Sequence, residues 1–396
     1  MPSNYQPNEA LKLKRPVQSW SSGTYLKNVS SLPNPFTFQD GAAVSTVADW
    51  YKRADELKRL FQSYELGWKP GKPAVFDARL NGTTLSITTG LTQTTAVTWN
   101  VSISYPTNST GPGPYAAMIA YDGLSIPLDA DIATITLTND NIAQQNDQSS
   151  RGVGIFYDIY GKNATAGATM AWAWATSRIM DALELIDIAE SNIDVKRVGI
   201  TGCSRNGKGA LVGGAFEPRL ALTIPQESGS GGSATWRISD AMFAAGVVTQ
   251  TAQEIIQENV WFGESFDPFV NDTALLPFDH HLLAALVAPR PILVLDNNGY
   301  EWLGPLSSYG GMSAAKTVWD ALGTTSTFGF SLAASHPHCQ FPADQQGAKL
   351  SSFLQRYLLN NTDVSTSVFD TATNGTDGNF TYVASDWITW TTPTLL

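Results

Sequence analysis

The first strong pattern along the chain is that of an amphipathic helix. Between residues 46 and 66, Trp50, Leu57, Leu60 and Phe61 recur at the spacing of one helical face. The charged residues 52, 53, 56 and 58 fill the other faces. A helix with one apolar stripe is expected to pack that stripe against a core.

The period changes to two between residues 74 and 106. Thr, Val and Ile alternate there, as in strands that bury one face. Asn81 and Gly82 form a dipeptide that is typical of a tight hairpin turn. We therefore expect antiparallel strands at the start of the sheet.

Short apolar strands then alternate with helices. Strands are expected at residues 115–120, 132–137, 198–201, 220–225, 291–295 and 327–333. Helices are expected at 169–189, 312–322 and 343–359, and a further helix follows Ser204 and ends at residue 216. This alternation predicts an α/β fold, a three-layer αβα sandwich whose mostly parallel central sheet has helices on both faces. Residues 1–30 are polar and predict an N-terminal arm, residues 31–396 a single domain, and residues 362–396 a surface segment.

The composition is that of an ordered globular protein. Of the 396 residues, 43% are hydrophobic and 15% are charged, so the chain can bury a large core. The net charge of −11 argues against a nucleic-acid partner, because binding phosphates needs a basic face. No apolar run is long enough to span a bilayer, and the residues after Met1 are polar. We expect a soluble chain without a membrane partner, whose export signal is absent or already removed.

Sequons favour a secretory route and an extracellular location. Nine Asn-x-Ser/Thr sequons occur, most of them in Gly-, Thr- and Ser-rich loops: Asn28, Asn81, Asn100, Asn108, Asn163, Asn271, Asn360, Asn374 and Asn379. The two cysteines, Cys203 and Cys339, are consistent with this route but too few to establish it.

Ser204 stands where an apolar strand meets a helix. The strand at 198–201 runs into Gly202 and Ser204 and then into a helix-forming stretch, as at the nucleophile elbow of α/β-hydrolases. Such a helix directs its first N–H groups at a developing oxyanion. The usual glycine two places after the serine is replaced by Asn206, and Gly207 follows one place later. On the motif alone, a nucleophile and a structural serine in a glycine-rich turn are equally good interpretations.

A serine nucleophile needs a base, and the chain has four histidines. His280 and His281 open a helix-like stretch, which favours a structural role for at least one of them. His336 and His338 follow the strand at 327–333, where an α/β-hydrolase places its base.

The cysteines distinguish the last two histidines. Cys203 precedes Ser204 and Cys339 follows His338. A triad that brings Ser204 within about 3 Å of His338 would also bring these cysteines within disulfide reach. The alternative is a pair of free, buried cysteines.

Two carboxylates could orient the histidine and stabilise its charged form. Asp296 ends the strand at 291–295, the usual position of the acid, and Glu227 follows the strand at 220–225. Both stand at carboxyl ends of parallel strands, where sites gather in open sheets. The usual position of the acid in this fold, taken alone, slightly favours Asp296 as the third member of the triad.

The chain resembles the fungal glucuronoyl esterases, carbohydrate esterases that cleave esters between the (4-O-methyl-)glucuronic acid of glucuronoxylan and lignin alcohols. The resemblance covers nearly the whole chain and rests on residues 32–38, 64–67, 202–208, 225–231, 258–262, 278–281 and 338–342. The nucleophile motif with its following Arg205 and Lys208 is specific to that family. The resemblance implies an α/β-hydrolase fold and a lignin–carbohydrate substrate.

The resemblance also implies roles for single residues. Glu227, not Asp296, would complete the triad of Ser204 and His338, and Arg205 would stabilise the oxyanion. The remaining positions match substrate-binding residues of the family: Lys208, Gln250, Glu258 and Trp302. Helical periodicity does not place Gln250 and Glu258 on one face. No metal-ligand spacing such as His-Glu-x-x-His occurs, so no metal or cofactor is expected.

The chain departs from the family in one respect. Fungal members usually carry further disulfides, for instance through a cysteine where this chain has Thr235. No cellulose-binding module is visible, and we expect a monomer. Another secreted serine esterase of the acetylxylan or feruloyl type, or a catalytically silent carbohydrate-binding relative, is the alternative function.

Overall fold

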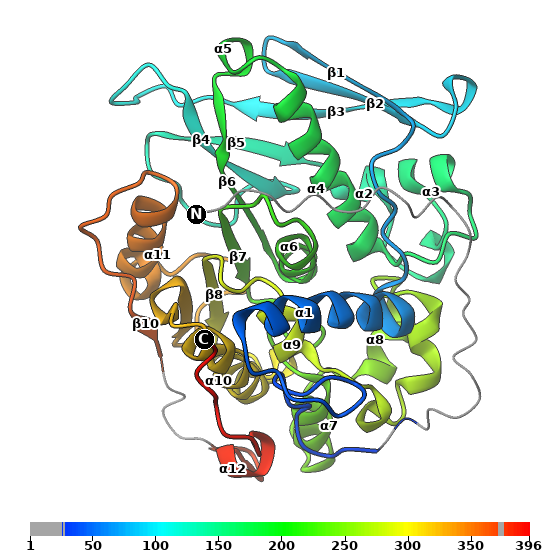
Figure 1. Ribbon diagram of the computed structural model, residues 1–396, viewed down its shortest axis with the longest axis vertical. Coiled ribbons are helices and arrows are strands. Elements are labelled where there is room, and N and C mark those ends of the chain that lie inside the picture. Colours follow the sequence, from blue (N-terminus) through cyan, green and yellow to red (C-terminus); the bar gives the residue numbers. More distant parts are fainter. Residues whose placement is uncertain (1–25, 27, 371–375) are drawn as a thin grey trace.

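A ten-stranded sheet organises the molecule. Figure 1 shows the computed structural model, which describes residue 26, residues 28–370 and residues 376–396. The strand order is β1-β2-β3-β5-β4-β6-β7-β8-β9-β10. The strands are β1 (Val75–Asn81), β2 (Thr84–Gly90), β3 (Val97–Ser104), β4 (Tyr115–Tyr121), β5 (Ile132–Leu137), β6 (Ile193–Cys203), β7 (Leu222–Gln226), β8 (Ile292–Asn297), β9 (Phe328–Ala333) and β10 (Val368–Phe369), and a separate hairpin pairs β11 (Thr376–Asp377) with β12 (Phe380–Thr381).

The sheet has an antiparallel part and a parallel part. Strands β1, β2, β3 and β5 pair antiparallel in succession, with a two-residue hairpin turn at Gly82 and Thr83. From β5 through β4 to β10, every neighbouring pair is parallel. The predicted fold, a mostly parallel sheet preceded by antiparallel strands, is confirmed.

Helices cover both faces of the sheet. The longer ones are α1 (Val47–Phe61), α4 (Ala168–Leu185), α6 (Arg205–Phe216), α7 (Trp236–Ala244), α10 (Pro305–Ala321) and α11 (Ala343–Tyr357). The shorter ones are α2 (Asn139–Ile142), α3 (Ile155–Tyr160), α5 (Ile188–Ser191), α8 (Ala252–Glu258), α9 (His280–Ala285) and α12 (Ala384–Trp387), and single 3-10 or π turns are η1 (Gln62–Leu66), η2 (Gln93–Thr95), η3 (Gln148–Ser150), η4 (Glu264–Phe269), η5 (Thr273–Leu275), η6 (Glu301–Leu303) and η7 (Thr325–Thr327).

The alternation of side chains along the strands divides the core in two. In β8, Ile292 and Val294 join the larger core with α1, α4, α6, α9 and α10, whereas Leu293 and Leu295 join a second core with α11. Successive residues of a strand point to opposite faces, so a strand covered on both sides is apolar throughout. The result is the expected three-layer sandwich (Figure 1).

The first helix matches its prediction. Thr46 caps α1 by accepting the N–H of Asp49, and Trp50, Leu57, Leu60 and Phe61 are each at most 3% exposed. The helix continues as the π turn η1 until Gly67, whose φ is 73°. A Cβ atom at Gly67 would lie 1.9 Å from the carbonyl oxygen of Thr165, so glycine is required there.

The structure differs from prediction in several places. The helix expected at 169–189 ends at Leu185, because Ile186 is extended and Asp187 caps the separate helix α5. The helix expected at 312–322 begins earlier, at Pro305. The C-terminal segment is not wholly superficial, since β10 extends the sheet beside β9 and Leu395 is buried.

Candidate active site

Strand β6 passes through a tight turn at Ser204 into helix α6. Ser204 has a φ of 60°, in the left-handed region, and its N–H donates to the carbonyl of Gln226 on β7. A Cβ at Gly202 would lie 2.5 Å from the carbonyl oxygen of Asn206. A Cβ at Gly207 would lie equally close, 2.5 Å, to that of Gln226. Gly207 therefore lets α6 approach β7, and the geometry is that of a nucleophile elbow.

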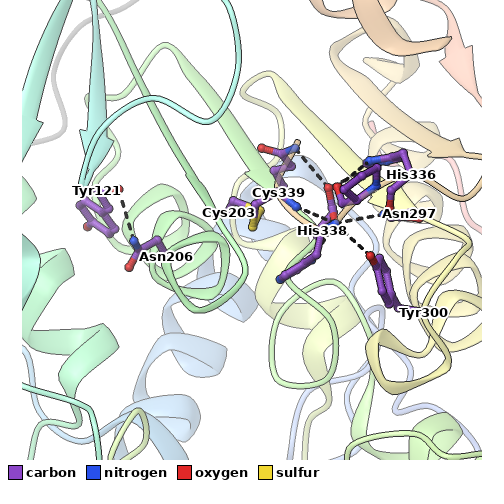
Figure 2. Close-up of a disulfide and its surroundings, with 11 residues drawn as sticks. Tyr121, Cys203, Asn206, Asn297, Tyr300, His336, His338 and Cys339 are labelled. Carbon is purple, nitrogen blue, oxygen red and sulfur yellow. Dashed lines mark hydrogen bonds and ion pairs between the residues drawn. A yellow bond between two sulfur atoms is a disulfide. The ribbon is translucent and has the colours of Figure 1, made fainter. Parts of the chain in front are cut away.

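Asn206 explains the displaced glycine. Its Nδ2 donates to the carbonyl of Tyr121 at the end of β4, 3.3 Å away, and its Oδ1 accepts from Nδ2 of Asn139, 3.0 Å away. Figure 2 shows Tyr121 and Asn206 beside the turn. The asparagine thus ties the elbow to the neighbouring strand and to α2.

His338 and Glu227 form a close pair. Nδ1 of His338 lies 2.7 Å from Oε2 of Glu227, which is 1% exposed. Glu227 follows β7 with a φ of 43°, and His338 lies in the loop after β9. The backbone N–H of Cys339 also donates to Oε2 of Glu227, at 3.2 Å. The carboxylate therefore orients the imidazole and can stabilise its protonated form.

A disulfide joins the two loops that carry Ser204 and His338. Cys203 and Cys339 are bonded, with their Cα atoms 5.8 Å apart, as predicted (Figure 2). Nε2 of His338 is buried and has no hydrogen-bond partner among the described residues. Together with Cys203 and Cys339 it forms a group with atoms close enough to hold a metal, but the disulfide removes both thiolates as ligands.

Asp296 makes no hydrogen bond or ion pair with His338 in the described part of the chain. Its Oδ2 instead accepts from Oγ of Ser233 at 2.8 Å, and its side chain is buried. Burial raises the pKa of Asp296 to about 7, and the charge of Glu227 adds to the rise. Of the two candidate carboxylates, Glu227 is thus the one that contacts His338.

Two cations flank the elbow on helix α6. Arg205 is exposed and its charge acts on Asp122 at the end of β4. Lys208 is buried, and its Nζ donates to the carbonyls of Ser228 and Ser230, the latter at 2.8 Å. Burial lowers the pKa of Lys208 to about 7. Lys208 therefore braces the loop that follows Glu227.

Three more predicted residues form a series of contacts that reaches His338 through Trp302. Nε2 of Gln250 lies 3.3 Å from Oε2 of Glu258, and the Gln250 N–H donates to the carbonyl of Trp302. The Trp302 ring centroid lies 4.8 Å from that of His338. Gln250 precedes α8 instead of lying on it, which is why helical periodicity could not bring Gln250 and Glu258 together.

Two further residues contact the Glu227–His338 pair and were not predicted from the sequence. Nδ2 of Asn297 donates to Oε2 of Glu227 at 3.2 Å and to the carbonyl of His336 at 2.9 Å. The hydroxyl of Tyr300 accepts the His338 N–H at 3.1 Å. Asn297 ends β8 and Tyr300 follows it (Figure 2). Their position at and just after the end of β8, between the loops that carry Glu227 and His338, is the sequence feature that could have indicated them.

The other histidines and the sequons lie outside this site. His280 and His281 are fully buried in α9, and Nε2 of His280 lies 2.6 Å from Oε1 of Glu65. Eight sequons have exposed asparagines: Asn28, Asn81, Asn100, Asn108, Asn163, Asn271, Asn360 and Asn379. Asn374 lies outside the described residues. Within the described chain, no helix is long and apolar enough to cross a membrane.

The comparisons with known proteins agree with one another. The family model for fungal glucuronyl esterases matches residues 88–323. The chain is 49% identical to 4-O-methyl-glucuronoyl methylesterase 1 of Wolfiporia cocos over 374 residues, covering 93% of this chain and 90% of that protein.

Two solved structures are similar as well. The glucuronoyl esterase catalytic domain of Hypocrea jecorina aligns with a TM-score of 0.88 and 46% identity, covering 94% of this chain and 98% of that one. A mutant of the Sporotrichum thermophile enzyme in complex with methyl 4-O-methyl-beta-D-glucopyranuronate aligns with a TM-score of 0.87 and 42% identity, covering 93% and 97%.

The fold and the site thus define a carboxylic ester hydrolase built on an α/β-hydrolase sheet. The chain belongs to the fungal glucuronoyl esterase family. The family resemblance inferred from the nucleophile motif is confirmed.

Proposed function

We propose that Ser204, His338 and Glu227 are the catalytic residues of a serine esterase. Its substrate is the ester between (4-O-methyl-)glucuronic acid side chains of glucuronoxylan and lignin alcohols. The proposal rests on the 2.7 Å contact between His338 and Glu227. The disulfide joins the loop that carries His338 to the turn that carries Ser204. The complex of the Sporotrichum thermophile relative with a methyl glucuronate ester supports the substrate class.

The first step forms an acyl-enzyme. Oγ of Ser204 attacks the uronoyl carbonyl carbon while Nε2 of His338 takes its proton, and Glu227 stabilises the resulting imidazolium. The tetrahedral intermediate then collapses: the ester C–O bond breaks, and His338 returns the proton to the departing lignin alcohol. In the second step water attacks the acyl-enzyme with His338 again as base, which releases the uronic acid and restores Ser204.

The oxyanion is stabilised at the start of helix α6. The first N–H groups of this helix and the guanidinium of Arg205 supply partial and full positive charge there. A charged donor strengthens a hydrogen bond to an anionic oxygen. This role requires the exposed Arg205 side chain to turn toward the substrate carbonyl.

The sugar is held by polar groups around the pair. We assign its hydroxyl contacts to Lys208, Gln250 and Glu258, and its aromatic contact to Trp302, because Gln250 contacts both Glu258 and Trp302, and Trp302 lies beside His338. Lys208 already donates to two carbonyls of the loop after Glu227. Its ammonium has three donors, so one stays available for a hydroxyl.

The protein is a secreted, N-glycosylated monomer in this proposal. The exposure of eight sequon asparagines supports glycosylation and hence export. Mass spectrometry of the chain expressed in a fungal host behind an added secretion signal, before and after removal of N-glycans, tests the glycosylation. A secreted chain whose mass does not change on this treatment contradicts it.

Hydrolysis of benzyl glucuronate tests the substrate class. The chain is expected to turn over benzyl glucuronate and to leave an acetyl ester such as acetylated xylan intact. The reverse preference would identify an acetylxylan esterase, and activity on feruloyl esters alone would identify a feruloyl esterase. Labelling of Ser204 by a fluorophosphonate excludes a catalytically silent carbohydrate-binding protein.

A further inference from the structure

The two oxygens of Glu227 have different surroundings. Oε2 is fully engaged: it accepts from Nδ1 of His338 at 2.7 Å, from Nδ2 of Asn297 at 3.2 Å and from the N–H of Cys339 at 3.2 Å. The three donors come from the end of β8 and from the loop after β9. This oxygen therefore serves the histidine loop.

Oε1 of Glu227 faces a second histidine. Its hydrogen-bond donor in the described chain is Nε2 of Gln226, 3.2 Å away. Nε2 of His336 lies 3.9 Å from the same oxygen, which is too far for a hydrogen bond. The His336 side chain is 8% exposed, and its Nε2 is buried with no hydrogen-bond partner among the described residues.

The other ring nitrogen of His336 favours one tautomer. Nδ1 lies 3.1 Å from the carbonyl oxygen of Pro337. A carbonyl only accepts, so this contact is a hydrogen bond in the tautomer that carries its proton on Nδ1. In that tautomer the neutral ring bears a lone pair on Nε2, 3.9 Å from Oε1 of Glu227, and the two acceptors have no hydrogen to share. One added proton on Nε2 would convert this gap into an ion pair.

The position of His336 is set by the site itself. Its carbonyl accepts from Asn297, the residue that also donates to Glu227 (Figure 2). The titratable groups around it are Glu227 after β7 and His338 on its own loop. The charges of Glu227 and of Lys208 on α6 both act on Asp296 at the end of β8.

We propose that His336 is a positioning residue that acts through Glu227 and must be neutral for turnover. When a proton from solvent binds Nε2, the new N–H donates to Oε1 and the charge of Glu227 is shared between two imidazole rings. The imidazolium that His338 forms during attack by Ser204 then gains less stabilisation. The inference rests on the proposed triad. It implies that low pH inactivates the site through two protons, one on His338 and one on His336.

The pH dependence of kcat/KM for benzyl glucuronate tests this role. In the wild type the acid limb should reach a limiting slope of two, because His336 and His338 must both be neutral. His336→Met can neither bind a proton nor donate, and His336→Gln donates without titrating, so both should show a slope of one. Gln340→Ala, at an exposed residue of the same loop, should keep the wild-type slope.

Two readouts separate the possible failures. Fluorophosphonate titration counts folded sites in each variant, and absence of labelling and turnover in the wild type would contradict the proposed function itself. A labelled, active wild type whose acid limb equals that of His336→Gln overturns only the role of His336. If the variants do not fold, nitrogen-15 NMR of the wild-type histidines decides: the inference requires the neutral Nδ1–H tautomer at His336, and an Nε2–H tautomer refutes it.

Discussion

Nδ1 of His338 lies 2.7 Å from Oε2 of Glu227, although 111 positions separate the two residues. Glu227 follows β7 and His338 follows β9, so the contact spans the carboxyl end of the intervening strand β8. Asn297, at the end of β8, donates to the same carboxylate oxygen. The pair is therefore built by three neighbouring strand ends, and the disulfide adds the fourth, β6.

Glu227 should matter more for turnover than Asp296. Glu227→Gln removes the charge that orients and stabilises His338, so kcat on benzyl glucuronate should fall by roughly 10³- to 10⁴-fold. Asp296→Asn leaves the His338 contact intact and should cost less than about tenfold. Steady-state kinetics of both variants measure the two losses in kcat. A larger loss of kcat in Asp296→Asn would identify Asp296 as the acid of the triad.

Asp296 should make stability depend on pH. Its pKa is about 7 in the folded state against an ordinary value of 3.8, so between these values the folded protein keeps a proton that the unfolded chain has lost. The stability that Asp296 contributes is therefore lost as the pH rises through this window. Relative to wild type, the free energy of unfolding of Asp296→Asn should increase over the same window.

Urea unfolding at several pH values between about 4 and about 7 measures this difference. Asp363→Asn, at an exposed aspartate, is the matched control for losing a carboxylate. A difference between Asp296→Asn and wild type that stays constant across the range contradicts the raised pKa.

The disulfide should stabilise the fold and the site together. It closes a loop with a sequence separation of 136. Chain entropy alone then predicts a loss of about 5 kcal/mol in the double variant Cys203→Ser, Cys339→Ser. Since the bond also joins the elbow to the His338 loop, kcat should fall more than KM rises in protein that remains folded. A double variant that unfolds at the wild-type urea concentration and keeps its kcat speaks against both effects.

Arg205 should act on the transition state. Arg205→Met removes a positive charge from the oxyanion position, and kcat is expected to fall by roughly 10²-fold with little change in KM. Arg205→Lys keeps the charge and should recover part of the loss. Because Arg205 is exposed, its replacement should leave the melting temperature nearly unchanged. Equal kcat values for Arg205→Met and wild type would remove this residue from the mechanism.

Much of the fold could be predicted from the sequence where hydrophobic pattern and packing agree. The apolar run 291–295 and the alternating strands at 74–106 became β8 and β1 to β3. The first turns of α10 were missed because they hold Ser307, Ser308, Gly310 and Gly311, which are poor helix formers. Tertiary packing requires glycine at one of these positions, because a Cβ at Gly310 would lie 2.7 Å from Cδ1 of Ile238.

The site was predictable only in part. Ser204 and His338 stand in local motifs, and the cysteine beside each of them connects the two motifs within the sequence itself. The choice of Glu227 over Asp296 needed the family resemblance, because strand ends alone do not show which carboxylate turns toward the next loop. Asn297, Tyr300 and His336 act through contacts between loops, for which the sequence carries no spacing rule.

The variant Ser204→Ala gives the most direct test of the nucleophile. Turnover of benzyl glucuronate by wild type and variant is measured together with binding of glucuronic acid by calorimetry. Ser204→Ala should lose hydrolysis to the background rate while it still binds the sugar, because the groups around Trp302 remain in place. Hydrolysis within about tenfold of wild type in this variant would contradict the assignment of Ser204 as nucleophile.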